Sequence, residues 1–428
     1  MSDDFKASVN VSRQWDGKRV GQELVDKIKQ DNVDPDFILL FSTIHYEGEF
    51  QKFLDIVKDE FPDAPLVGGT VAGFMSQEGC YTRGVSAMAV EYENMDVAVG
   101  VGHNTKRNPE KAAKKCAESL KLELKDSDYE NAFLIDVVSG GLVFELPFIG
   151  RKRVFRKFPG RLSNFVSRIT SFLFNKGPGR EEELLERLSS ELSEYNILSG
   201  SAMDDNRFLK NYQFYNRGVY KTSVVGLGLK TDLDFTFRRS HGLVKTGEKF
   251  QVSKTSYDDR FIYQLNNEPA LKEFLEKMNW PEEYISEEEL HSKTLYYPLG
   301  FEYNDSLWID VIALVSGDSL GMVHEVKTPE IHLLSTSGKN TIDAVEESLK
   351  EPEDGKNLLG FGYSCAIRLE TLGSNAFKVQ EKVWSHLNGE PFLVPYVTGE
   401  GFYKEREKLI FGNDTFNFLT FSTHEEER

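Results

Sequence analysis

The sequence predicts an α/β mixed fold of the α+β kind, with layered mixed sheets and helices. Three observations predict it. Apolar runs of strand length alternate with segments whose apolar residues have helical spacing. Several runs come in closely spaced pairs separated by turn residues, which favours antiparallel hairpins over a purely parallel sheet. The order strand, helix, strand, hairpin occurs twice in the first half, which indicates an internal duplication.

Composition excludes several classes of protein. The 428 residues carry a net charge of −18, so most of the surface repels nucleic acid. No apolar run approaches the roughly 20 residues that span a bilayer, and the first residues lack the apolar core of a secretory signal. Three cysteines cannot form a disulfide framework and suit a reducing compartment. We therefore expect a cytoplasmic protein.

The first half of the sequence gives the clearest alternation of predicted strands and helices. Its predicted elements, in chain order, are a strand at 37–41, a helix at 49–61, strands at 65–70, 81–90 and 97–101, a helix from 109, a strand at 132–138, a helix at 181–195 and a strand at 197–202. Proline at 62 ends the first of these helices and proline at 109 opens the second. Gly68 and Gly200 mark the corresponding second strands, and a YxRGV sequence follows each one, at 81–85 and 215–219.

From residue 241 the order of predicted strands and helices no longer follows that of the first half. The predicted elements are a strand at 261–265, a helix at 269–278, strands at 308–315 and 330–334, a helix from 337, a strand at 358–367, a helix at 377–387 and a strand at 416–421. These changes predict four segments, namely a lead-in at 1–30, a two-repeat domain at 31–237, a second domain at 238–422 and a tail at 423–428.

The segment 151–180 is an insert of opposite charge. It holds nine Lys or Arg and no Asp or Glu, which leaves −27 on the remainder. Residues 161–174 form an amphipathic pattern, with Phe165 and Phe172 on the apolar face and Arg161 and Arg168 among the cations. Three interpretations stay open: a lid on the acidic body, a contact with an anionic membrane, or a site for an acidic partner.

Several short motifs, taken in order, resemble the FIST family. The N-terminal ones are 67–73 (VGGTVAG), 84–86 (GVS) and 200–204 (GSAMD); the C-terminal ones are 241–242 with Gly247, 266–270 (NNEPA), 365–368 (CAIR), 399–400 (GE) and 413–415 (NDT). Together they cover roughly residues 30 to 422 and identify 31–237 as a FIST N-like and 238–422 as a FIST C-like domain.

The resemblance implies a cytoplasmic sensory module for signal transduction, without a known catalytic activity or cofactor. The implied ligand is a small molecule such as an amino acid or a related metabolite. The sequence departs from the family at 394–398 (VPYVT), where a Gly-aromatic-aromatic run is usual, and in the basic insert. Because no output domain remains in the chain, the resemblance implies a separate signalling partner.

The second domain supplies the first candidate site. Cys365 and Arg368 converge if the strand ends at Cys365, and the guanidinium would then lower the pKa of the thiol. Arg368 and Glu400, next to Gly399, suit a ligand with a carboxylate and an amine. The alternatives are a core cysteine and a structural salt bridge.

Strand ends in the first domain supply further candidates. Gly68, Gly69 and Thr70 end one apolar strand, and Ser139 and Gly140 end another, so that backbone N–H groups face a ligand. Tight turns are the alternative. Asp204 either binds an amine or caps a helix.

Enzyme signatures are weak. Metal-binding, nucleophile-elbow and phosphate-loop patterns are not found in the sequence, and the eight histidines show no zinc spacing. Three functions therefore remain: a sensor of a small polar metabolite, an enzyme with Cys365 as nucleophile, and a membrane-peripheral or scaffolding protein that acts through 151–180.

Overall fold

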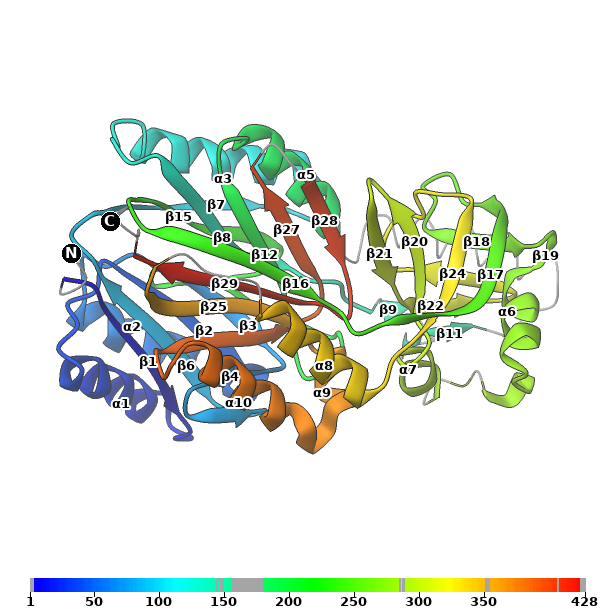
Figure 1. Cartoon of the computed structure of the whole chain (residues 1–428), viewed down its shortest axis with the longest axis horizontal. Coiled ribbons are helices and arrows are strands. Elements are labelled where there is room, and N and C mark those ends of the chain that lie inside the picture. Colours follow the sequence, from blue (N-terminus) through cyan, green and yellow to red (C-terminus); the bar gives the residue numbers. More distant parts are fainter. Residues whose placement is uncertain are drawn as a thin grey trace.

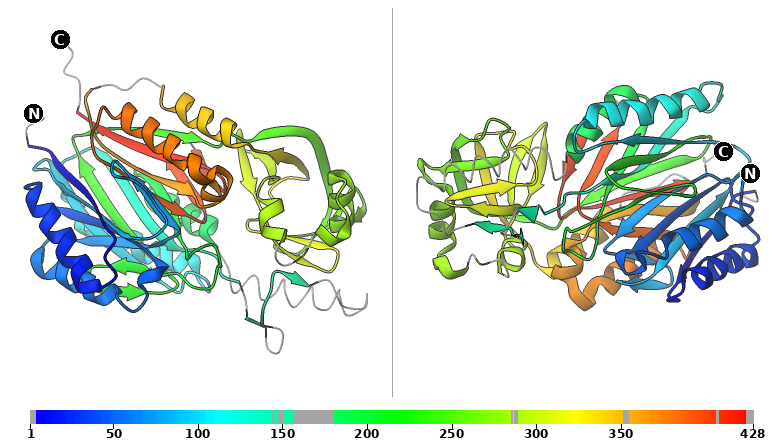
Figure 2. Two further views of the ribbon diagram at one scale, coloured as in Figure 1. Left: turned by 90° about the horizontal axis from the view of Figure 1, so that it is seen from below. Right: turned by 180° about the vertical axis from the view of Figure 1, so that it is seen from behind.

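Three six-stranded sheets form the body of the molecule, and a further sheet forms a lobe at one end (Figure 1). The structure is a computed structural model that describes residues 4–143, 145–146, 150–155, 180–284, 286, 289–350, 355–405 and 408–423. Helices cover the outer faces of the sheets, and both termini lie at the end of the body away from the lobe (Figure 2). The predicted layered α+β fold is confirmed.

The first unit of the body shows why these residues fold as they do. Its elements are β1 (Lys6–Ser12), α1 (Gly17–Gln30), β2 (Phe37–Thr43), η1 (Ile44–Tyr46), α2 (Phe50–Glu60), β3 (Leu66–Val71), β4 (Gly73–Ser76), β5 (Gly79–Tyr81) and β6 (Val85–Glu91). The Asp16 side chain caps α1 by accepting from the Arg19 N–H at 3.1 Å. All seven residues of β2 are buried, because helices cover one face and the other sheets cover the opposite face.

The second unit repeats this order. Its elements are β7 (Met95–His103), α3 (Pro109–Glu123), β8 (Asn131–Ser139), the short strands β9 (Glu145–Leu146), β10 (Gly150–Arg151) and β11 (Val154–Phe155), α5 (Glu181–Glu191), β12 (Asn196–Ala202), β13 (Gln213–Tyr215), β14 (Gly218–Tyr220) and β15 (Ser223–Thr231). As predicted, Pro109 opens α3, and Asn108 caps it.

A third unit completes the body. Its elements are β16 (Asp234–Ser240), α8 (Gly338–Ser348), β25 (Asn357–Cys365), α9 (Ile367–Leu372), η3 (Gly373–Asn375), α10 (Ala376–His386), β26 (Phe392–Val397), β27 (Glu400–Lys404), β28 (Lys408–Gly412) and β29 (Phe416–Ser422).

The lobe is inserted into this third unit, between β16 and α8. It contains β17 (Val244–Thr255), β18 (Phe261–Leu265), β19 (Glu268–Pro269), α6 (Ala270–Met278), η2 (Glu282–Tyr284), α7 (Glu289–Thr294), β20 (Leu299–Tyr303), β21 (Ser306–Asp310), β22 (Ile312–Ser316), β23 (Ser319–Met322) and β24 (Glu330–Ser335). The strand expected at 308–315 is therefore two strands, because the chain bends at Val311. Likewise the strand expected at 81–90 is β5 followed by β6.

The strand pairing shows three copies of one sheet. The orders β1-β6-β2-β3, β7-β15-β8-β12 and β16-β29-β25-β26 share two antiparallel pairings followed by one parallel pairing. The sequence indicated two copies; the inserted lobe hides the third. The two YxRGV sequences do not mark equivalent positions, because Tyr81 ends the second strand of its hairpin and Tyr215 ends the first.

The hairpin of each unit pairs with a strand of a neighbouring unit. β4–β5 joins β26, β13–β14 joins β3, and β27–β28 joins β12. Three backbone hydrogen bonds close a ring where the strands meet: Ala72 N–H to Tyr396 O (3.0 Å), Met203 N–H to Thr70 O (2.9 Å) and Thr398 N–H to Ser201 O (3.1 Å). The predicted boundary between residues 237 and 238 stays a prediction, and it falls within β16.

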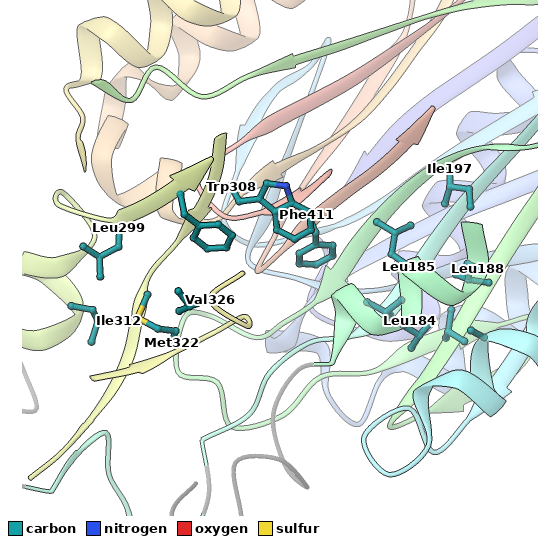
Figure 3. Close-up of a cluster of buried hydrophobic side chains, with 14 of the residues drawn as sticks. Leu184, Leu185, Leu188, Ile197, Leu299, Trp308, Ile312, Met322, Val326 and Phe411 are labelled. Atoms are coloured by element: carbon teal, nitrogen blue, oxygen red, sulfur yellow. The ribbon is translucent and has the colours of Figure 1, made fainter. Parts of the chain in front are cut away.

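An apolar cluster and an ion pair fasten the lobe to the body. Leu184, Leu185 and Leu188 of α5 share one buried cluster with Trp308 of β21 and Phe411 of β28 (Figure 3). Beside it, Arg260 of the lobe forms a buried ion pair with Glu182 of α5. The lobe therefore sits against the second and third units.

Candidate functional site

A cavity of about 100 Å³ lies where the second unit, the third unit and the lobe meet. Its volume is comparable with that of an engineered cavity of about 150 Å³ that accepts benzene. Its lining residues are Gly141, Leu142, Val143, Lys152, Arg153, Glu181, Met203, Asn206, Phe208, Leu295, Val311, Ile312, Ala313, Leu314, Val323, His324, Cys365, Ala366, Ile367, Thr398, Gly399 and Asn413. Most of the wall is apolar, with a few polar groups, as is usual for small-molecule sites.

Cys365 links this cavity to a buried polar cluster behind it. β25 ends at Cys365 and α9 begins at Ile367, so the chain turns there, and Cys365 lines the cavity. The Glu400 carboxyl group lies close to the thiol, and the backbone N–H groups of Ile367 and Asp414 face the sulfur.

Arg368 and Glu400 lie in this cluster and do not line the cavity. Arg368 is completely buried, donates from Nη2 to Thr341 O at 3.4 Å, and lies 5.8 Å from the centre of the Phe416 ring. Glu400 accepts from the N–H and hydroxyl of Thr415 at 3.3 and 2.9 Å. Cys365, Arg368, Gly399 and Glu400 are thus brought together, but a ligand in the cavity would touch only Cys365 and Gly399.

Burial controls the charges of this cluster. It raises the pKa of Glu400 to about 8 and that of Asp414 to about 7, and it lowers the pKa of Arg368. The expectation of a lowered thiol pKa is wrong, because burial, followed by the Glu400 and Asp414 carboxylates, raises the pKa of Cys365 well above its ordinary value. Cys365 is therefore a neutral thiol near neutral pH.

Glu181 and His324 add two buried polar groups to the cavity wall. Glu181 is 3% exposed, and burial, followed by the neighbouring Glu182, raises its pKa to about 7. Burial alone would lower the pKa of His324, but Asp310, 3.3 Å from its Nδ1, keeps it above the ordinary value. Glu181 Oε2 and His324 Nε2 lack a hydrogen-bond partner among the described residues.

The first-unit candidates lie away from the cavity. Gly68, Gly69 and Thr70 are inside β3, which continues to Val71, so the prediction that they end the strand is wrong. A Cβ at Gly68 would lie 1.7 Å from Leu40 O, so this glycine permits close strand packing. The Thr70 hydroxyl accepts from the Tyr212 N–H at 3.0 Å.

The second-unit candidates border the cavity without lining it. Ser139 ends β8 as predicted, and its hydroxyl donates to Asn211 at 2.9 Å, while Gly140 precedes the lining residue Gly141. The Asp204 carboxylate accepts from the four backbone N–H groups of residues 207–210. It thereby shapes a loop, which is the capping alternative, and this loop carries Phe208 to the cavity.

The residues predicted for a membrane or partner contact lie outside the described residues; they are Arg161, Phe165, Arg168 and Phe172. Sequence reasoning missed Glu181 and His324, because nothing in their local pattern separates them from surface polar residues, and it quoted Asn413 only as part of the 413–415 motif, without a place in the site. Within the part of the chain that the structure describes, no group of three or more His, Cys, Asp or Glu side chains is arranged to hold a metal ion.

Comparison with known proteins places the chain in a family. The family model described as the FIST N domain matches residues 36–268, which is more than half of the sequence. The chain belongs to the FIST family. FIST domains are in general sensory, ligand-binding modules of signalling proteins. In the described part of this FIST chain, no helix is long and apolar enough to cross a bilayer.

Two further similarities accompany the family match. An uncharacterised protein of Methanocaldococcus jannaschii is 24% identical over 423 residues, which cover 94% of this FIST chain and 72% of that protein. A cyanuric acid hydrolase from A. caulinodans aligns over 98% of this chain and 100% of its own, with 7% identity and a TM-score of 0.37. That score is too low to support an inference.

Proposed function

We propose that this FIST protein is a cytoplasmic sensor that binds a small metabolite in the cavity between the second unit, the third unit and the lobe. One observation carries the proposal: the cavity is lined by all three parts, and two of its buried polar atoms, on Glu181 and His324, have no hydrogen-bond partner among the described residues. A ligand there contacts body and lobe together. Its binding would therefore favour one arrangement of the two parts, which a separate signalling partner then recognises.

The lining favours a small amino acid or a related organic acid. Glu181 suits an ammonium group, the nearby cations Lys152 and Arg153 suit a carboxylate, and Val311 to Leu314 contact an apolar body. This assignment replaces the pair Arg368 and Glu400, which lies behind the cavity wall.

Thermal unfolding with a panel of amino acids, organic acids and nucleotides tests the proposal. A ligand at about 100 times its dissociation constant should stabilise the folded state by roughly 2.7 kcal/mol. Ala313→Phe, at the one partly exposed position of strand β22, fills the cavity and should abolish the response. Ala7→Phe, on the edge strand β1, is the matched control and should retain it. An unchanged response in Ala313→Phe would place the ligand elsewhere.

Glu181→Gln tests the ammonium contact separately. We expect at least a tenfold loss of affinity for the amino acid and little change for its deaminated analogue, with Glu191→Gln at the other end of α5 as the control. Because the pKa of Glu181 is about 7, amino-acid affinity should rise as the pH passes through 7 in the wild type but not in Glu181→Gln.

The basic insert supports a second candidate function, since nine cations without an acidic residue attract anionic surfaces. Flotation with anionic vesicles, compared with a deletion of 156–179, tests it. Equal flotation of both proteins would exclude membrane attachment through Arg161, Phe165, Arg168 and Phe172.

A further inference from the structure

The three units provide an internal comparison for Cys365. Thr43, Ser139 and Cys365 end β2, β8 and β25, and each pairs with the last residue of the following parallel strand. These last residues are Val71, Ala202 and Val397. The three side chains therefore occupy equivalent positions. Two units place a hydroxyl there, and only the third places a thiol.

The same comparison applies to Glu400. Gln213 and Glu400 each begin a hairpin strand, each pairs with a glycine of the neighbouring sheet, and each accepts a backbone hydrogen bond. The donors are the Ser223 N–H at 3.1 Å and the Thr415 N–H at 3.3 Å. Because neutral Gln213 makes this contact in the second unit, the fold does not require an ionisable group at Glu400.

The third unit thus has a thiol and a carboxyl group at the two positions where the second unit has Ser139 and Gln213. Glu400 is 1% exposed, and its Oε1 has no hydrogen-bond partner among the described residues. Burying such a group without full pairing is unfavourable, which indicates a role beyond stability. Cys365 lines the cavity directly, as does His324, whose Nε2 has no hydrogen-bond partner within the part of the chain that the structure describes.

We propose that Cys365 captures a small aldehyde with an anionic tail, by reversible addition of its thiol to the carbonyl carbon. The proposal rests on the proposed function, since it names the ligand class of the same cavity. An S–C bond forms and the C=O π bond breaks. The thiol proton passes to Glu400 behind the thiol, and the carbonyl oxygen in the cavity takes up a proton from the lining residue His324. Proton exchange with solvent then returns both residues to their starting states, so the net product is a hemithioacetal.

Two features favour an aldehyde over other electrophiles. Addition to an aldehyde needs no leaving group, water or oxidant, whereas acyl transfer and thiol oxidation need at least one of them. It is also reversible, so occupancy follows the aldehyde concentration, as a sensor requires. Lys152 and Arg153 suit the anionic end, and a cavity of about 100 Å³ favours a small aldehyde.

The test uses 4-oxobutanoate labelled with ¹³C at the aldehyde carbon, added to the full-length protein. Wild-type protein should give a hemithioacetal ¹³C signal distinct from those of the free aldehyde and its hydrate. Cys365→Ser should remove this signal, and Glu400→Gln should slow its appearance at least tenfold, because Glu400 acts on the rate of addition and not on the equilibrium. Cys80→Ser, which changes a half-buried thiol outside the cavity, should leave it unchanged. Circular dichroism checks folding; if Cys365→Ser does not fold, Glu400→Gln carries the comparison, because Gln fits at the equivalent position.

Calorimetry with 4-hydroxybutanoate separates this proposal from the proposed function. The aldehyde should bind the wild type at least tenfold more tightly than the alcohol, and Cys365→Ser should remove that difference. Equal binding of both compounds without a hemithioacetal signal would overturn the covalent step and leave a ligand-binding cavity. A signal that persists in Cys365→Ser would also overturn it. A flat response to these compounds and to the whole thermal-unfolding panel would overturn both proposals.

Discussion

Replacing Glu400 by glutamine should make the protein less sensitive to pH. The pKa of Glu400 is raised from 4.5 to about 8 in the folded chain, mainly by burial. The folded state therefore holds this proton more tightly than the unfolded state does. The contribution of this proton to the free energy of unfolding is complete below pH 4.5. It falls as the pH rises to about 8 and does not change further above that.

The magnitude follows from the size of this shift. Each pH unit in the interval corresponds to about 1.4 kcal/mol, so wild-type stability should fall by about 4 kcal/mol between pH 5 and 8 through this one group. Glu400→Gln removes the contribution while keeping an oxygen that accepts from Thr415. The variant should equal the wild type near pH 5 and exceed it by about 4 kcal/mol at pH 8.

Urea unfolding of both proteins at pH 5, 6, 7 and 8 measures this difference, because other groups that titrate in the interval are present in both. Glu302→Gln, which removes an exposed carboxylate paired with Lys245, is the control and should show a small difference that does not grow with pH. A difference between Glu400→Gln and wild type that stays constant within about 1 kcal/mol would refute the reasoning.

Three further substitutions test the packing around the cavity. Arg260→Met should destabilise the chain by about 3–5 kcal/mol, since it leaves Glu182 buried without its partner, and thermal unfolding should show recovery when Glu182→Gln is added. Gly200→Ala places a Cβ 2.7 Å from the Tyr363 ring, so a loss of about 1–3 kcal/mol is expected in the same assay; an unchanged melting temperature would contradict this contact. Asp204→Ala should lower ligand affinity more than stability, because four N–H groups beside the cavity lose their acceptor, and calorimetry of folded variant protein measures this.

Many of the helices and strands could be predicted from the sequence. Pro62 and Pro109 fixed helix ends, and apolar runs located β2, β8, β12 and β25, because burial on both faces leaves a continuous apolar signature. The predicted strand at 358–367 runs two residues too far, because the apolar run continues through Ala366 and Ile367, whereas β25 ends at Cys365 and α9 begins at Ile367.

The site itself depends on longer-range arrangement. The third unit is interrupted by the lobe between β16 and α8, so its repeat has no constant spacing in the chain. His324 reaches the cavity only because the lobe folds back against α5, and no local pattern encodes that packing. The thiol pKa was predicted from one neighbour, Arg368, whereas burial and two carboxylates decide its direction.

The exchange of hairpins has a consequence for how the chain is made. β4–β5 emerges early in synthesis, yet its partner β26 lies near the other end of the chain, where Ser76 pairs with Leu393. Until that strand arrives, the early hairpin leaves an unpaired sheet edge, which is prone to aggregation. Because each unit completes its neighbour around a closed ring, no unit finishes folding alone. A nascent chain of this architecture therefore stays dependent on protection, by a chaperone or by the ribosome surface, until its last strands are released.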